Sequence, residues 1–203
     1  KKLNNRMFQT KKYMKKIIAG FDEVGRGSLK GPVYAAAVIL EKKIDRKKLK
    51  DSKKLSKKNR KILDAYIKKN CIWAIGSASL KEIEKHNILN ASLLAMKRAI
   101  KKLKKKPQLV LIDGNKLPKI DNYNLKNIIK GDQKIPEISA ASIIAKVSRD
   151  RLVSKMSKKF KKYFWDKNSG YGTKDHIKAI KKFGITKYHR KTFQPVHNIL
   201  SLR

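Results

Sequence analysis

The residues best suited to chemistry in this sequence are carboxylates that stand next to apolar segments. Asp22 and Glu23 directly follow the apolar run Ile17–Phe21, and Asp113 directly follows a second run, Leu109–Ile112. Adjacent strand residues point to opposite faces, yet where a strand ends both can reach one ion. Each ionised carboxylate raises the pKa of the next, so a cluster of them favours a bound cation. An ordinary turn with an N-capping acid is the alternative explanation of the Asp-Glu pair.

The composition limits the kind of metal. Cys71 is the only cysteine, which excludes an internal disulfide and a thiolate zinc cluster, and the four histidines lack the paired spacing of a zinc site. Oxygen ligands suit Mg²⁺ or Mn²⁺, and Mg²⁺ is often shared between carboxylates and substrate phosphates. We therefore expect any metal to be held by oxygen.

A glycine-rich loop follows the first two carboxylates. Gly25 and Gly27 bracket Arg26, and Gly31 comes shortly after. Glycine lets the backbone approach a ligand closely and lets its N–H groups face an anion. Tight turns need glycine too, so the loop gains weight only from the acids beside it.

The charge balance favours a polyanionic partner. The 203 residues include 54 Lys and Arg against 15 Asp and Glu, a net charge of +39. Neutralised phosphates and released counterions favour nucleic acid as that partner. A genome biased toward A+T codons is the alternative source of much of the lysine.

Targeting signals are not evident. The basic stretch Lys1–Lys16 precedes an apolar run of only five residues, where a secretion signal needs about seven or more. The longest apolar run, Val33–Leu40, is far shorter than the roughly 20 residues of a membrane-spanning helix. We expect a cytoplasmic protein without a membrane segment.

Apolar patterning predicts alternating strands and helices. Strands are predicted at 17–21, 33–40, 71–80 and 109–112, and helices at 55–69, about 88–103 and 139–153. The alternation predicts an α/β sheet covered by helices, with functional residues beyond the carboxyl ends of strands. From Phe160 onward the chain is aromatic and basic. We expect Tyr163, Phe164 and Trp165 to form a small core, with stacking on bases as the alternative.

At this point a family resemblance is clear. The run from Gly20 to Leu40, GFDEVGRGSLKGPVYAAAVIL, resembles the opening signature of the type 2 ribonucleases H, the ribonuclease HII family. Further blocks resemble the family in the same order, over about Ile17 to Val196: Asp51–Ser56, Asn87–Leu89 with Ala95-Met96, Leu111–Asn115, Ser139–Arg151, Gly170–Thr173, and His189-Arg190 with Phe193. Ser169 and Thr192 depart from it, where lysine and serine are commoner.

The resemblance implies a fold and an activity. The fold is α/β, a ribonuclease H-like mixed sheet flanked by helices with a small helical C-terminal region. Residues 1–16 form a basic extension, 17–158 the catalytic domain, and 159–203 a substrate-binding region packed on it. The implied enzyme hydrolyses the RNA strand of RNA/DNA hybrids and incises 5′ of ribonucleotides embedded in duplex DNA, leaving 5′-phosphate and 3′-hydroxyl ends. Ribonucleotide excision repair and DNA replication are the implied processes, with a monomeric enzyme and a replication clamp as a further possible partner.

The resemblance also implies roles for particular residues. Asp22, Glu23, Asp113 and Asp150 are the implied ligands of Mg²⁺ or Mn²⁺, with two ions present when substrate is bound. Gly25, Arg26 and Gly27 are implied to sense the ribose 2′-hydroxyl, Tyr171 to pack at the RNA-to-DNA junction, and Ser52 and Lys53 to make phosphate or backbone contacts. His176 and His189 are further candidates for substrate contact or proton transfer.

Two rival functions differ from this interpretation. A basic RNA-binding or ribosome-associated protein without catalysis has no reason to place acids beside its ligand. A nuclease of the same fold that acts on DNA alone, such as a junction resolvase, needs neither the Gly-Arg-Gly loop nor Tyr171.

Overall fold

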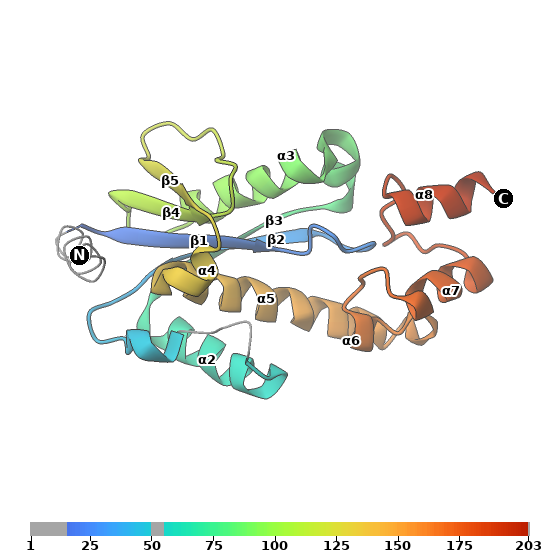
Figure 1. Cartoon of the computed structure of the whole chain (residues 1–203), viewed down its shortest axis with the longest axis horizontal. Helices are drawn as coiled ribbons and strands as arrows, with labels where there is room; N and C mark the ends of the chain where they lie inside the picture. Colours follow the sequence, from blue (N-terminus) through green and yellow to red (C-terminus); the bar gives the residue numbers. More distant parts are fainter. Residues whose placement is uncertain (1–15, 50–54, 203) are drawn as a thin grey trace, which may run out of the picture.

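The computed structural model describes residues 16–49 and 55–202, and its centre is a mixed five-stranded sheet (Figure 1). The strands are β1 (Ile18–Val24), β2 (Val33–Ile39), β3 (Ile72–Ala78), β4 (Leu109–Asp113) and β5 (Leu125–Ile128), in the order β3-β2-β1-β4-β5. β2 is antiparallel to β1 and β3, whereas β1 runs parallel to β4 and β4 to β5. The four predicted strands are present. β5 was not predicted, because its sequence Leu-Lys-Asn-Ile is half polar and it lies at the sheet edge.

Helices make up most of the rest of the described chain. They are η1 (Arg46–Leu49), α2 (Lys57–Asn70), α3 (Leu80–Lys101), α4 (Gly131–Lys134), α5 (Pro136–Ser157), η3 (Lys161–Tyr163), α6 (Trp165–Asn168), α7 (Lys174–Phe183) and α8 (Gln194–Ser201). α2 starts where one predicted signal stands, since the Ser56 hydroxyl accepts a 3.1 Å bond from the Asn59 N–H. No helix in the described ranges has the length and apolar character needed to cross a membrane.

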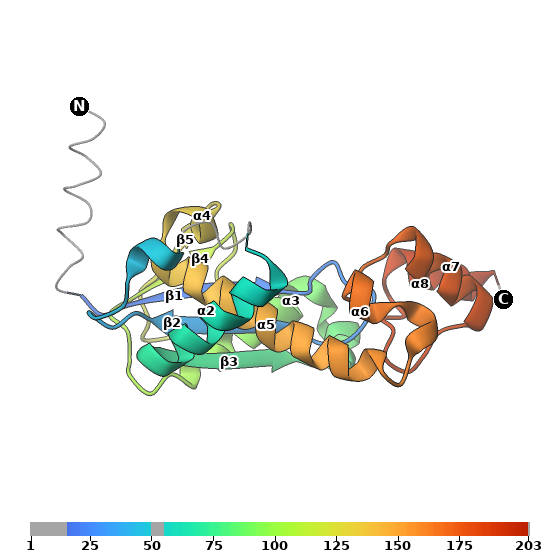
Figure 2. The same cartoon turned by 90° about the horizontal axis from the view of Figure 1, so that it is seen from below.

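The sheet is covered on both faces, with α3 on one side and α5 and α2 on the other (Figures 1 and 2). Phe21, Ala35 and Ile112 point into the apolar cluster of the α3 side, while Ala36 and Ile144 belong to the cluster of the α5 side. Buried strands that pack on both faces carry near-continuous apolar runs, which explains the sequences of β1, β2 and β4.

α5 crosses the sheet in direct contact with β1. A Cβ atom at Gly20 would lie only 1.9 Å from the carbonyl carbon of Glu137, so no residue with a side chain fits at that position. This close crossing fixes the N-terminal half of α5 over the carboxyl half of β1, which is where the acidic residues lie.

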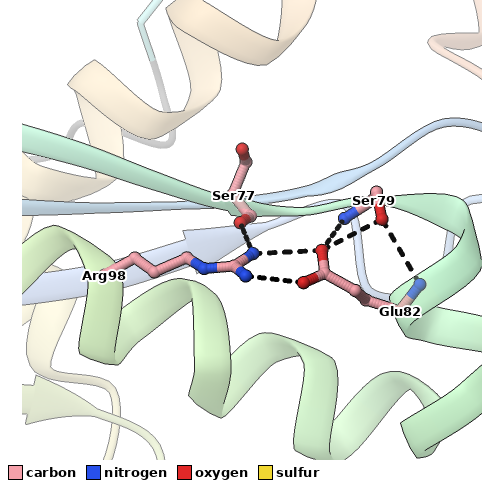
Figure 3. A network of polar contacts seen from close by, with 4 residues as sticks. All are labelled: Ser77, Ser79, Glu82 and Arg98. Atoms are coloured by element: carbon pink, nitrogen blue, oxygen red, sulfur yellow. Dashed lines mark hydrogen bonds and ion pairs between the residues drawn. The ribbon is translucent and has the colours of Figure 1, made fainter.

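α3 is bent sharply at Asn87, whose backbone is non-helical with φ 63° and ψ 170°. The Asn87 side chain accepts a 3.0 Å bond from the Asn90 N–H and so caps a second segment, which explains the predicted start near Ile88. Figure 3 shows how the two segments are joined: Arg98 Nη2 lies 2.6 Å from Glu82 Oε1, and Arg98 Nη1 donates to the Ser77 carbonyl at 2.8 Å. Residues sixteen apart on a straight helix are about 24 Å apart, so this ion pair requires the bend.

The C-terminal region gathers at one end of the long axis (Figure 2). Its apolar cluster combines Trp165, Ile180 and Val196 with Leu29 from the loop after β1 and Val153 from α5. Trp165 is fully buried and Tyr163 is 5% exposed, so the prediction of a small core is confirmed for these two rings. Phe164 is 42% exposed and contributes little to that core.

Candidate active site

Asp22 and Asp113 meet at the carboxyl ends of neighbouring parallel strands. The register pairs Phe21 with Ile112, so the next residue of each strand is an aspartate. β1 extends to Val24, because its pairing with β2 continues through Val24 and Tyr34. The prediction that Asp22 and Glu23 follow the strand was therefore wrong in detail: they lie within β1, but beyond its pairing with β4.

Burial and like charge dominate the electrostatics here. The pKa of Asp22 is raised well above its normal value, first by burial and then by Glu23 and Asp113, while a hydrogen bond with the Ser142 side chain lowers it. Asp22 shares the sheet face of Gly20, against which α5 packs, so α5 supplies Ser142. Asp22 Oδ1 also accepts a 2.7 Å bond from the Glu23 N–H.

Glu23 is a second, partly buried acid. Its pKa is raised, mainly by burial and also by Asp113, although Arg26 acts in the opposite direction. The Arg26 Nη1 atom lies 3.3 Å from Glu23 Oε1, which links the loop to the acidic site. Asp22, Glu23 and Asp113 therefore form one electrostatically coupled group, as the sequence predicted.

Asp132 is the acid that sequence reasoning missed. The N–H of Gly131 donates a 2.7 Å bond to Asp113 Oδ1, which places the next residue beside the end of β4. Asp132 is 2% exposed, and both of its carboxylate oxygens are buried. The small number of acids, 15 Asp and Glu in 203 residues, was the available signal in the sequence, but the segment showed no apolar periodicity to draw attention to Asp132.

Asp150 is not brought to the other three acids. Its Oδ1 atom lies 2.9 Å from Lys146 Nζ one turn earlier on α5, and its side chain lines a cavity between α5 and α2 with Arg60. Burial lowers the pKa of the neighbouring Arg149, an effect that the charges of Tyr171 and then Asp150 oppose. Within the described ranges, no three His, Cys, Asp or Glu side chains are arranged as a preformed metal-binding group.

The Gly25-Arg26-Gly27 loop and Tyr171 do come together. Leu29 N–H donates to the Gly170 carbonyl at 2.8 Å, and Ser28 and Tyr171 form a β-bridge. Arg26 and Gly27 are exposed. Among the described residues, a Cβ atom at Gly27 would meet only the Tyr171 ring, 3.8 Å away. Loop and ring thus form one surface that follows directly from the acidic strand. Ser52 and Lys53 lie outside the described residues.

His176 and His189 lie in the interior of the C-terminal region. Both are about 1% exposed or less. His176 Nδ1 lies 2.9 Å from the Tyr171 carbonyl, an acceptor, so that nitrogen carries the proton and Nε2 accepts from Trp165 Nε1 at 3.0 Å. His189 Nδ1 accepts from the Thr186 N–H at 2.8 Å. Burial lowers both pKa values, that of His189 to about 4. Two buried neutral histidines that hold the segment around Tyr171 are poorly placed to transfer protons to a substrate.

A mixed sheet that carries acids at the adjacent ends of β1 and β4, covered by helices on both faces, defines the ribonuclease H-like class of nucleases. Comparisons with known proteins identify the branch of that class. A model of the ribonuclease HII family matches residues 19–196. Ribonuclease HII of Pelagibacter ubique is 73% identical over 91% of this chain and 100% of its own length, and that of Rickettsia bellii is 51% identical over 90% and 92%.

Solved structures agree with that assignment. The ribonuclease H2 of Pyrococcus horikoshii matches with a TM-score of 0.78 and 26% identity, over 91% of this chain and 97% of that one. The ribonuclease HII in a PCNA complex from Archaeoglobus fulgidus matches with a TM-score of 0.71 and 26% identity, over 88% and 95%. The chain belongs to the ribonuclease HII family, endoribonucleases that act on RNA/DNA hybrids.

Proposed function

We propose that this enzyme also incises duplex DNA 5′ of single embedded ribonucleotides, with divalent ions held by Asp22, Glu23, Asp113 and Asp132. The observation that carries the proposal is the continuity of β1: the strand that contains Asp22 and Glu23 leads directly into the loop that meets Tyr171. One surface thus combines a site for phosphate chemistry with a site that can read a sugar. In this proposal the enzyme works in the cytoplasm, in ribonucleotide excision repair and DNA replication.

The acidic residues suit a hard cation. Three coupled carboxylates with raised pKa values for Asp22 and Glu23 gain from a nearby positive charge. Mg²⁺ or Mn²⁺ takes oxygen ligands, and two such ions supply water activation and stabilisation of the leaving 3′ oxygen, which yields 5′-phosphate and 3′-hydroxyl ends. Asp132 replaces Asp150 as our candidate for the fourth ligand, because it adjoins the residue that binds Asp113.

The loop and Tyr171 provide selectivity in this proposal. The 2′-hydroxyl is both donor and acceptor, and backbone groups that approach it closely can distinguish ribose from deoxyribose. Gly27 leaves room for that approach, and the Arg26 side chain links the loop to Glu23. The Tyr171 ring packs against the deoxyribose 3′ of the ribonucleotide, where a further 2′-hydroxyl would crowd it.

Three matched duplexes test the function. Their cleaved strand contains no ribonucleotide, one ribonucleotide or only RNA, and each is incubated with Mg²⁺, with Mn²⁺ or with a chelator. We expect metal-dependent cleavage of the second and third duplexes, with 5′-phosphate ends. Cleavage of the all-DNA duplex, or an intact single-ribonucleotide duplex, would contradict the proposal.

The C-terminal helix suggests a second interaction. The ribonuclease HII of Archaeoglobus fulgidus forms a complex with PCNA. In this chain, Leu200 is 37% exposed and Leu202 86% exposed at the end of α8. We propose that these two side chains bind an apolar pocket of the replication clamp and that the enzyme is otherwise a monomer. Loss of clamp binding in Leu200→Ser/Leu202→Ser, with unchanged hydrolysis of free hybrid, is the expected result; undiminished clamp binding would refute it.

A further inference from the structure

One buried guanidinium group binds the backbone of the Gly25-Arg26-Gly27 loop. Arg190 is fully buried, its Nη1 donates to the carbonyl of Arg26 at 2.9 Å, and its Nε donates to the carbonyl of Gly31 at 2.9 Å. The two carbonyls belong to residues five positions apart, so a single side chain holds two points of the segment that connects β1 to β2.

The main chain around Arg190 binds the same loop. Arg190 N–H donates to the Leu29 carbonyl at 2.8 Å, and Gly31 N–H donates to the Tyr188 carbonyl at 2.9 Å. The segment from Tyr188 to Arg190 therefore runs alongside the loop as a short bridge, and its side chain at 190 reaches beneath it.

Among the described residues, Arg190 has no acidic partner to explain its burial. Within the described ranges, none of the ion pairs includes Arg190 or the neighbouring buried Arg149. Burial, and then the charge of Arg149, lower the pKa of Arg190 to about 9, so it remains protonated near neutral pH. Burying such a charge is costly unless several good hydrogen bonds compensate. The bonds from Nε and Nη1 to the two carbonyls offset part of this cost, because the planar fork of donors matches them, while Nη2 is buried without a hydrogen-bond partner among the described residues.

The Arg26 carbonyl matters because of its own peptide group. A peptide bond is planar and trans, so the carbonyl oxygen of Arg26 and the N–H of Gly27 point in opposite directions. Arg190 binds that oxygen from the buried side, which turns the Gly27 N–H toward the exposed side of the loop. The exposed side is the one a substrate reaches.

We infer that Arg190 is a positioning residue for ribose recognition, which sets the direction of the Gly27 N–H by holding the Arg26 carbonyl. The inference rests on the proposed role of the loop in reading the 2′-hydroxyl. Arg190 itself does not touch the substrate. It transmits the rigidity of the C-terminal region to a loop that is otherwise exposed at Arg26 and Gly27.

Binding measurements in Ca²⁺ test the inference without requiring turnover. The ratio of affinities for a single-ribonucleotide duplex and for the identical all-DNA duplex is measured for the wild type, Arg190→Lys and Arg190→Met. We expect the ratio to fall roughly tenfold in Arg190→Met, consistent with the loss of charge-assisted hydrogen bonds, and less in Arg190→Lys, which keeps the charge and can bind one carbonyl. All-DNA affinity should stay within about twofold, because no phosphate contact is removed.

A matched control separates positioning from general destabilisation. Ile180→Ala leaves a cavity in the same C-terminal cluster, where Ile180 is fully buried. It should lower the melting temperature and retain the wild-type ratio at temperatures where it is folded. Steady-state cleavage provides a second readout: Arg190→Lys should lower kcat more than it changes KM.

The results separate a failure of the Arg190 inference from a failure of the proposed ribose recognition. A wild-type ratio near one would refute ribose reading by the loop, and the inference with it. Suppose that the wild type prefers the single-ribonucleotide duplex and that Gly27→Ala abolishes this preference. If Arg190→Met and Arg190→Lys nevertheless keep it, the inference alone is overturned. An equal loss of the ratio in Ile180→Ala and Arg190→Lys would also overturn it, because the effect would then follow stability.

Discussion

Arg149 lies directly against Gly25: a Cβ atom added at Gly25 would come within 2.3 Å of Arg149 Nε. Gly25 also has φ +93°, a conformation that residues with a side chain rarely adopt. Two positions later, Gly27 has no such neighbour within the part of the chain that the structure describes. The two glycines of the loop therefore have different roles. Gly25 is required by its packing against Arg149, whereas Gly27 keeps the exposed surface of the loop free of a side chain.

This difference yields a paired prediction. Gly25→Ala should lower the melting temperature, because backbone strain alone costs about 1–3 kcal/mol and the guanidinium of Arg149 must also move. Gly27→Ala should melt like the wild type and yet cleave hybrid more slowly, by roughly a hundredfold if the sugar is displaced by about 1 Å. Thermal melts and initial rates of both variants check this. A destabilised Gly27→Ala, or one with normal cleavage, would contradict it.

The fourth acid can be identified by a second pair of variants. Asp132→Asn should reduce cleavage by more than the roughly 10- to 100-fold typical of residues that only support metal ligands. Asp150→Asn should change cleavage less than about tenfold, because a partly exposed ion pair contributes at most about 1 kcal/mol. Rates at saturating Mn²⁺, with circular dichroism as the folding control, decide between them; the opposite ranking would return Asp150 to the site.

Asp22 should determine how metal affects stability. Its raised pKa means that the folded state favours the protonated acid, so this residue costs stability as the pH rises from the normal aspartate pKa through the raised value. Without metal at pH 7, Asp22→Asn should melt at or above the wild-type temperature. Mn²⁺ at about 100 times its Kd should stabilise the wild type by about 2.7 kcal/mol and Asp22→Asn much less. Equal metal stabilisation of both proteins would remove Asp22 from the proposed ligands.

Tyr171→Ala should slow cleavage at a single ribonucleotide more than cleavage within continuous RNA. An aromatic stacking contact is worth roughly 1–3 kcal/mol, about fivefold to over a hundredfold in rate. Tyr171→Phe keeps the ring and should remain close to the wild type on both substrates. Equal losses on the two substrates would instead show that the ring only pins the C-terminal region to the loop.

Lys30 should give a distinctive pH dependence of stability. It is fully buried, with Nζ 3.8 Å from the centre of the Trp165 ring, and burial lowers its pKa to about 7. An unfolded lysine has a pKa near 10.4, so the folded state binds the proton more weakly and stability rises as the pH increases from about 7 to 10. Melting curves of Lys30→Met should lack this component of the rise. The variant should exceed the wild type in melting temperature near pH 7, and an identical pH slope in both would contradict the argument.

The sequence alone determined the main strands, the three long helices and three of the acids, because each depends on local pattern. Apolar runs such as Leu109–Ile112 specify buried strands whatever surrounds them, and an aspartate at the end of each run is visible without knowing the fold. The glycines of the loop could also be recognised, as could the family through its ordered motifs. β5 and α4 escaped prediction, because short polar segments at a sheet edge acquire their structure from neighbours.

Only the tertiary structure decided which distant residues meet. The sequence does not distinguish Asp132 from Asp150 as a ligand. In the structure, the Gly131–Asp113 hydrogen bond brings Asp132 to the end of β4, whereas α5 directs Asp150 toward α2. Likewise, nothing local links Arg190 to Arg26, 164 positions earlier. Buried polar groups take the partners that the packed chain offers, so such pairings depend on which backbone carbonyls the fold leaves within reach.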